Sequence, residues 1–181
     1  MPRHLINDVI KPWEELNALL VNPFAVEPGL SDITRLASSL SISIKHQVDF
    51  RKGSKRESKF RKEVEIASLE NRMISDVADA AKHGKLRDPA RDNRLNVASC
   101  FEYKPNRGYR FIRNSITILY ENANEYDFMT TSLAATKYWM AYLGISLGRE
   151  LIVSEGPEEF SPTAYLYYNP AYCTRAMAES W

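Results

Sequence analysis

The sequence predicts an α+β fold that is mostly helical, with a helical bundle and, in the C-terminal half, an antiparallel β-hairpin forming a small sheet. Apolar residues recur at helical spacing over about 5–84, and the pattern then changes to alternation around a KPNRG turn. The 181 residues, 44% of them hydrophobic, suffice for one buried core. We therefore expect a single domain over 1–181, with a hairpin and helix over about 95–144 and a strand and aromatic tail over 150–181.

Two helices are predicted before Gly53. Residues 5–20 carry leucine, valine and tryptophan at helical spacing, and Pro12 either marks the first turn or introduces a kink. A second helix is expected to begin near Ser31, which suits an N-cap, and to continue to about Phe50.

The stretch that ends at Gly84 can be interpreted as one helix or as two. Ser54 and Glu57 have the form of a capping box, and no proline or glycine interrupts the helical pattern that follows. A single helix would be long for a small domain. We therefore favour a break at Ala67–Ser68, with Ser68 as the N-cap of a separate helix and Gly84 as its C-cap.

The second half begins with the alternating segments LNVASCFEY and YRFIRNSITILYE, which predict the two strands of the hairpin. A helix is then expected to be capped near Thr130 or Thr131 and to end at Gly144. The segment LIVSE, residues 151–155, predicts a further strand, and an aromatic tract follows over 164–172. Because an isolated hairpin is barely stable, we expect these last segments to cover it or to extend its sheet.

Composition excludes several classes of protein. A net charge of +1 excludes binding of polyanions through a large overall positive charge. Contacts with a nucleic acid would therefore have to come from local basic patches. Two cysteines without a CxxC pair exclude a thiolate zinc site and a disulfide scaffold. No apolar run is long enough to span a membrane, and the N-terminus, with its acids and a proline, is unlike a signal peptide. We expect a cytoplasmic protein that does not contact membranes.

Two predicted helices share a pattern. RLASSLSISIKH, residues 35–46, and RMISDVADAAKH, residues 72–83, agree in register at arginine, serine, lysine and histidine. Coincidence between two amphipathic helices is the alternative explanation. If the break before Ser68 is real, the two helices should run roughly parallel, with His46 and His83 at the same end.

The second of these helices carries a polar stripe. It consists of Arg72, Asp76, Asp79 and His83, which lie on one helical face. We expect Asp79 to hydrogen-bond the ring of His83, and Asp76 to pair with Arg72. A metal site is an alternative, with His46 and Asp49 joining Asp79 and His83 as ligands. Interhelical ion pairs are the simpler explanation.

Short motifs carry a family resemblance. HQVDF at 46–50, DVADAAKH at 76–83, a hairpin and a late helix with KYW resemble a loose group of small, uncharacterised bacterial helical proteins. At a greater distance the helical part resembles the HEPN superfamily, whose ribonuclease members use a closely spaced arginine and histidine. That resemblance implies binding or acting on RNA, with His83, Arg72, His46 and Asp79 as the candidate catalytic centre. Arg72 and His83 are farther apart than the HEPN pattern requires, so whether the chain is an enzyme stays open.

Basic residues gather at three connections between elements: the stretch 51–62, the stretch 82–91 and the hairpin turn. If they share one surface, it would bind phosphates. The candidate nucleic-acid-binding residues are Lys55, Arg56, Lys59, Lys85, Arg87 and Arg107. Tyr103 and Tyr109 could stack on bases or pack across the strands.

Two functions from different classes follow. The first is a HEPN-like domain that binds or acts on RNA through the basic surface and the Arg/His/Asp centre. The second is a non-catalytic interaction or structural protein whose Asp/His stripe is an internal ion-pair network. The tyrosine-rich tract 164–172 could contact a protein partner. No nucleophile motif or glycine-rich phosphate loop occurs, so we expect no cofactor.

Overall fold

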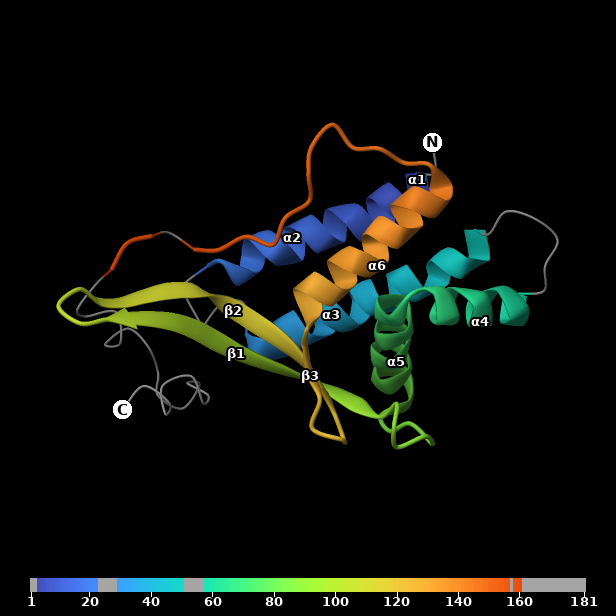
Figure 1. The fold of residues 1–181 in the computed structure, drawn as a ribbon, viewed down its shortest axis with the longest axis horizontal. Coiled ribbons are helices and arrows are strands. Elements are labelled where there is room, and N and C mark those ends of the chain that lie inside the picture. The colour runs from blue at the N-terminus through green and yellow to red at the C-terminus, as the bar shows by residue number, and fades with distance from the viewer. Residues whose placement is uncertain (1–2, 23–28, 51–56, 157, 161–181) are drawn as a thin grey trace.

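The computed structural model describes residues 3–22, 29–50, 57–156 and 158–160. Helices gather around one end of a long β-hairpin, and the tip of the hairpin extends beyond them (Figure 1). This arrangement confirms the predicted α+β fold, mostly helical, with a small antiparallel sheet in the C-terminal half.

The N-terminal helical rod is continuous from α1 (Arg3–Leu5) through a π-helical segment (Ile6–Ile10) to α2 (Lys11–Leu20). Pro12 lies in the first turn of α2, as one of the two sequence interpretations has it. Proline has no N–H, and in α geometry its ring would collide with the carbonyl of Asp8. The wider π turn directly before α2 lets the rod accommodate this proline.

Helix α3 (Leu30–Lys45) is followed by a 3₁₀ segment (His46–Phe50). The prediction that Ser31 caps this helix was wrong. Gly29 is the N-cap, and its carbonyl accepts hydrogen bonds from the backbone N–H groups of Asp32 (2.9 Å) and Ile33 (3.2 Å). Ser31 therefore already lies inside the first turn, and the α-helical geometry ends before the expected Phe50.

The predicted break between α4 (Glu57–Ala67) and α5 (Leu69–His83) is confirmed. Ser68 has an extended backbone (φ −142°), and its Oγ accepts a hydrogen bond from the N–H of Asn71 at 3.1 Å. Gly84 ends α5 with φ +77°, a conformation that favours glycine. Ser54 of the proposed capping box lies outside the described residues.

Helices α3 and α5 pack against each other but do not run parallel, so that part of the expectation was wrong. The extended Ser68 turns the chain sharply, and α5 crosses α3 steeply (Figure 1). Small residues line a gap between the two helices: Ala80 and Ala81 of α5 and Thr34 and Ser38 of α3 border a hollow of about 270 Å³.

The sheet consists of β1 (Asn93–Lys104), β2 (Gly108–Tyr120) and β3 (Glu125–Asp127), in that order. The hairpin pairs from Asn93 opposite Tyr120 to Lys104 opposite Gly108, with a register shift between Cys100 and Phe101. The short strand β3 pairs with residues 117–119 of β2 and was not predicted, since three residues are too few to show alternation.

Helix α6 (Phe128–Leu143) ends at Gly144, as predicted. Its N-cap is Asp127, whose Oδ1 accepts a hydrogen bond from the N–H of Thr130 at 2.7 Å, so the predicted cap at Thr130 or Thr131 was wrong. Trp13 of α2 donates from Nε1 to the hydroxyl of Ser132 at 3.1 Å, which joins α2 to α6 inside the core.

The segment 151–155 is extended but is not a strand, which corrects the prediction for LIVSE. Its backbone bonds to a helix side chain: Asn17 of α2 donates to the carbonyl of Ile152 and accepts from the N–H of Ser154, both at 3.0 Å. Gly156 then reaches β2, where its N–H donates to the carbonyl of Ile112 at 2.6 Å. The aromatic tract 164–172 lies outside the described residues.

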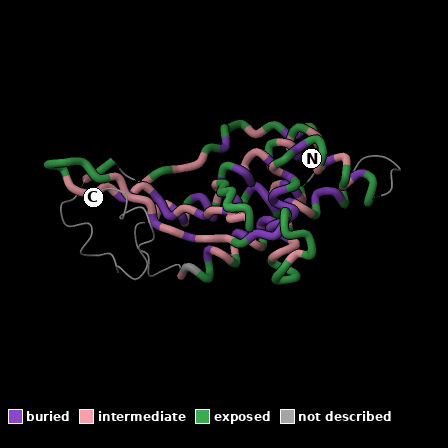
Figure 2. The backbone as a smooth tube through the Cα atoms, turned by 60° about the horizontal axis from the view of Figure 1, so that its bottom comes forward, coloured by how far each residue is buried: buried purple, intermediate pink, exposed green. Residues whose placement is uncertain are grey.

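Buried residues concentrate where the helices meet the base of the hairpin, whereas the hairpin tip is exposed (Figure 2). The largest fully buried side chains are those of Trp13, Trp139 and Phe128. Within the described ranges, every helix is too short or too polar to cross a membrane.

Candidate functional site

The polar stripe on α5 changes from exposed to buried along its length. Arg72 and His83 are exposed, Asp79 is half-buried and Asp76 is only 1% exposed. The four residues share a helical face, as predicted, but that face is partly covered by the connection between α5 and β1 and by the end of β2. Their partners therefore come from other elements.

Asp76 binds Arg91 and Tyr120. The Nε of Arg91, in the α5–β1 connection, donates to Oδ1 of Asp76 at 2.6 Å, and Nη2 forms an ion pair with the same oxygen. The hydroxyl of Tyr120 at the end of β2 donates to Oδ2 at 3.4 Å. The expected Asp76–Arg72 pair was wrong, because Arg91 reaches the buried carboxylate from outside the helix.

Burial governs the electrostatics of this cluster. It raises the pKa of the Asp76 carboxyl above its ordinary value, although the hydrogen bond and charge of Arg91 act in the opposite direction. Burial also raises the pKa of the Tyr120 phenol, and the neighbouring Asp76 carboxylate adds to that shift. The cluster therefore joins α5, the α5–β1 connection and β2 through one desolvated carboxylate.

Asp79 forms an ion pair with Nζ of Lys45 at the end of α3, instead of bonding His83 as expected. The side chain of Lys45 is 14% exposed and that of Asp79 is 33% exposed. His83 forms no hydrogen bond or ion pair within the described part of the chain. His46 bonds Asp49 on its own segment, with 2.9 Å between Nδ1 and Oδ2.

Two hollows adjoin along this face. The α4 hollow, of about 620 Å³, lies between α4, the end of α3 and α5, and the loop hollow, of about 480 Å³, lies under the α5–β1 connection. Asp79 and Arg91 line both, and we call the two hollows together the basic site. Its cations are Lys45, Arg61, Lys62, Lys85, Arg87 and Arg91, and its carboxylates are Glu57, Glu65, Asp79 and Asp88.

Most of these cations are already paired with a carboxylate. Besides the pairs of Lys45 and Arg91, Nη2 of Arg61 lies 2.8 Å from Oε1 of Glu57, and Nζ of Lys85 lies 3.5 Å from Oε1 of Glu121. Lys62 and Arg87 have no carboxylate partner among the residues that the structure describes. These two side chains hold the positive charge that a bound anion could neutralise.

The predicted nucleic-acid-binding residues do not form one surface. Lys85 and Arg87 line the loop hollow, and Lys59 is exposed on α4, whereas Lys55 and Arg56 lie outside the described residues. Arg107 is at the hairpin turn, at the opposite end of the sheet from the α5–β1 connection (Figure 1). A strand of twelve residues spans roughly 40 Å, so the expectation of one surface from all three clusters was wrong.

The hairpin turn has its own contacts. The Phe160 ring lies under the Arg107 guanidinium, with 4.7 Å to the ring centroid, and under Nζ of Lys104 at 5.1 Å. The rings of Tyr103 and Tyr109, opposite each other in the hairpin, have centroids 4.9 Å apart. This geometry supports the cross-strand packing alternative for the two tyrosines.

The candidate catalytic residues are only partly brought together. Asp79 and His83 line the loop hollow, whereas Arg72 lines a different hollow, with Ile66 and Leu69, which shares Lys62 and Glu65 with the α4 hollow. Among the described residues, no three His, Cys, Asp or Glu side chains are placed to hold a metal ion, which does not support the His46, Asp49, Asp79 and His83 set.

Three partners of the α5 carboxylates were not predicted from the sequence. Arg91 and Tyr120 bind Asp76, and Lys45 binds Asp79. Arg91 is part of the basic stretch 82–91, but it lies in the connection after α5 and not on the helix. Helical spacing therefore could not predict that it pairs with Asp76. No protein-family model, curated protein or solved structure matches the chain in the three comparisons.

Proposed function

We propose that the chain binds single-stranded RNA in the cytoplasm through the basic site, without base specificity. The observation that carries this proposal is that Lys62 and Arg87 line the basic site and have no carboxylate partner within the described residues, so that a phosphate could pair with each of them. Phosphate contacts give most of the affinity in sequence-independent binding. The resemblance of the helical part to HEPN domains supports RNA over other polyanions.

The shape of the basic site also favours a single strand. The α4 hollow and the loop hollow meet at Arg91, so a bound backbone would turn around this side chain from Lys62 toward Arg87. A single strand can bend to follow such a path, whereas a duplex is stiff over this length. Lys45 neutralises Asp79 at the junction, which lowers the repulsion that this shared carboxylate would exert on phosphates.

Catalysis remains a separate prediction. His83 is exposed and lines the loop hollow beside Asp79, where it could act on a bound strand. Arg72 lines another hollow and His46 pairs with Asp49, so the support for a combined Arg72–His46–His83 centre is weaker than the support for binding.

Binding is tested by fluorescence anisotropy with a fluorescein-labelled oligouridine at 50 mM salt. The double variant Lys62→Ala/Arg87→Ala should bind at least about tenfold more weakly, since two phosphate contacts are lost. The matched control Lys11→Ala/Lys137→Ala removes two exposed cations from α2 and α6. Equal losses in both double variants would show that only the net charge matters and would contradict the proposed site.

A second candidate function, protein binding, is favoured by one specific observation. Ile66 is 87% exposed and Leu69 48% exposed where α4 meets α5, and with Lys62 and Arg72 they line a hollow of about 450 Å³. In this alternative the Asp76–Arg91 and Lys45–Asp79 pairs are a structural network. Partner capture abolished by the uncharged variant Ile66→Ser/Leu69→Ser, with oligouridine affinity unchanged, would favour this function.

A further inference from the structure

The exposed apolar corner where α4 meets α5 adjoins the basic site. Its hollow of about 450 Å³, which we call the corner hollow, is lined by Lys62, Glu65, Ile66, Leu69 and Arg72. Lys62 and Glu65 also line the α4 hollow, so the corner hollow continues the basic site along α4. A strand that follows the basic site from Arg87 past Arg91 to Lys62 would therefore reach the corner hollow next.

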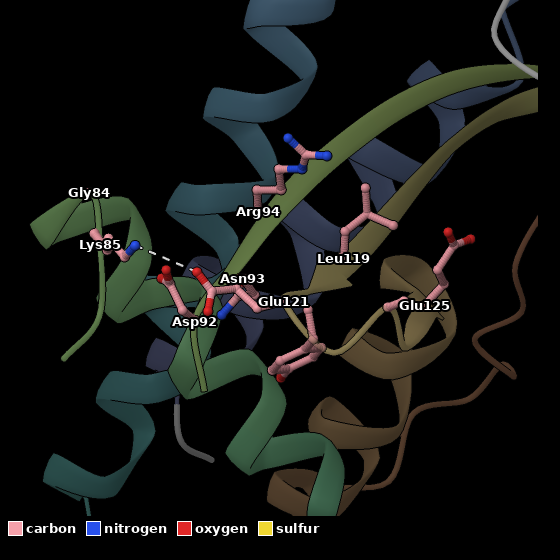
Figure 3. Close-up of a pocket in the computed structure, with 10 residues that line it drawn as sticks. Gly84, Lys85, Asp92, Asn93, Arg94, Leu119, Glu121 and Glu125 are labelled. Atoms are coloured by element: carbon pink, nitrogen blue, oxygen red, sulfur yellow. Dashed lines mark ion pairs between the residues drawn. The ribbon is translucent and has the colours of Figure 1, made fainter. Parts of the chain in front are cut away.

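The hollow at the other end of this path is unsuited to phosphates. It lies at the open end of the sheet and shares Lys85 with the loop hollow. Figure 3 shows the carboxylates that line it, which are those of Asp92, Glu121 and Glu125. Its cations are Lys85 and Arg94, and Lys85 is already paired with Glu121 at 3.5 Å. The carboxylates outnumber the cations and would repel the backbone of a nucleic acid, so we expect the strand to extend from the α4 hollow instead.

Ile66 and Leu69 give the corner hollow an apolar wall that is open to water. Ile66 is 87% exposed and Leu69 is 48% exposed. Covering such aliphatic side chains with another apolar surface is favourable, because it removes both surfaces from water. The face of a nucleobase is a surface of this kind, and all bases have one. The wall therefore suits a base without selecting which base it is.

Arg72 adds a planar cation to the same hollow. Its side chain is exposed, and its guanidinium forms no hydrogen bond or ion pair among the described residues. A guanidinium plane can stack on a base, and its charge attracts the adjoining phosphate. Lys62, which has no carboxylate partner there either, can contact a phosphate at the border with the α4 hollow.

Glu65 favours a nucleobase over an acidic peptide as the occupant of the corner hollow. Two cations beside an apolar wall would also suit a peptide that carries carboxylates and apolar side chains. The carboxylate of Glu65 would repel the acidic groups of such a peptide, whereas it can accept a hydrogen bond from an N–H group on the edge of a base. Each of the four RNA bases carries an N–H donor, so this contact requires no particular base.

We propose that the corner hollow is a nucleobase subsite of the RNA-binding surface. One base of the strand packs on Ile66 and Leu69 and stacks on the guanidinium of Arg72, while a neighbouring phosphate contacts Lys62. This inference rests on the proposed RNA binding and adds that the protein holds a base as well as the phosphates. A strand with bases is therefore bound more tightly than a bare sugar–phosphate chain.

The test compares two fluorescein-labelled strands of equal length by anisotropy, oligouridine and an abasic sugar–phosphate strand. The wild type should bind oligouridine about fivefold more tightly than the abasic strand. Ile66→Ser should weaken the binding of oligouridine and leave that of the abasic strand unchanged. Arg72→Lys keeps the charge but loses the plane, so it should also weaken oligouridine binding alone. The matched control Ile152→Ser removes a side chain that is 61% exposed on the segment 151–155 and should change neither affinity.

Equal affinities of the wild type for the two strands would overturn the subsite and leave the proposed phosphate binding intact. An oligouridine affinity that is the same in Ile66→Ser, Ile152→Ser and the wild type would overturn the subsite as well. So would an equal loss of both strands in Ile66→Ser, since the abasic strand has no base to pack there. If the wild type binds neither strand, the RNA binding itself is contradicted, and the subsite with it.

Discussion

Replacing Asp76 by alanine should lower the free energy of unfolding by about 2 kcal/mol. The change removes the acceptor of the Arg91 Nε hydrogen bond, which is 2.6 Å long, and of the weaker Tyr120 hydrogen bond at 3.4 Å. It leaves the phenol of Tyr120, a half-buried residue, without this acceptor. The connection between α5 and β1 also loses its attachment to the helix.

The magnitude follows from the geometry of the pair. A hydrogen bond to a charged group contributes about 1.5–3 kcal/mol, and breaking a fully buried ion pair costs about 3–5 kcal/mol. The side chain of Arg91 is 38% exposed, so water replaces part of the lost interaction and the lower range applies. The long Tyr120 bond adds little.

Urea unfolding followed by circular dichroism at pH 7 measures this loss, and the melting temperature should fall by about 4–8 °C. Asp8→Ala, which removes an exposed carboxylate from the N-terminal rod, is the matched control and should change stability by less than about 0.5 kcal/mol. If Asp76→Ala is as stable as this control, Asp76 does not hold the α5–β1 connection, and the account of the cluster is wrong.

Three further predictions concern the same region. Because burial raises the pKa of Asp76 above 3.8, the folded state keeps this proton to higher pH than the unfolded state. The stability that Asp76 contributes should therefore fall as pH rises through the raised pKa, and the wild type should exceed Asp76→Asn by more at pH 4 than at pH 7 in urea unfolding. The same difference in stability between the wild type and Asp76→Asn at both pH values would refute the raised pKa of Asp76. Asp79→Ala leaves the mostly buried Lys45 unpaired and should cost about 1–2 kcal/mol; a melt identical to the wild type would count against the pair. Ser68→Ala removes the N-cap of α5 and should cost about 1 kcal/mol, whereas Ser58→Ala on α4 should be nearly neutral, and equal effects would argue against the cap.

Features set by neighbouring residues could be predicted from the sequence. The break at Ser68 and the end of α5 at Gly84 depend on capping chemistry within one turn, and both are confirmed. The hairpin depends on alternation over long segments and is confirmed as well. The helix start near Ser31 was wrong because the carbonyl of Gly29 already closes the first turn. Local sequence patterns therefore predict the type of an element more reliably than the residue at which it begins.

Features set by contacts between distant segments could not be predicted. The extended segment 151–155 has a strand-like composition, but the side chain of Asn17 bonds its backbone in place of a neighbouring strand. Likewise, helical spacing pointed to Arg72 and His83 as partners of the α5 carboxylates, whereas Arg91 and Lys45 approach from outside the helix. The sequence identified the α5 carboxylates and the basic connection but not which cations they bind.

The central claim is that the basic site binds single-stranded RNA, and the salt dependence of oligouridine binding tests it most directly. Anisotropy titrations between 50 and 200 mM salt should show log K falling with log salt by about 0.7 for each phosphate contacted. In Lys62→Ala/Arg87→Ala the magnitude of this slope should decrease by about 1.4, since two contacts are lost, whereas Lys11→Ala/Lys137→Ala should keep the wild-type slope. No binding of the wild type at 50 mM salt, or the same slope in all three proteins, would contradict the account.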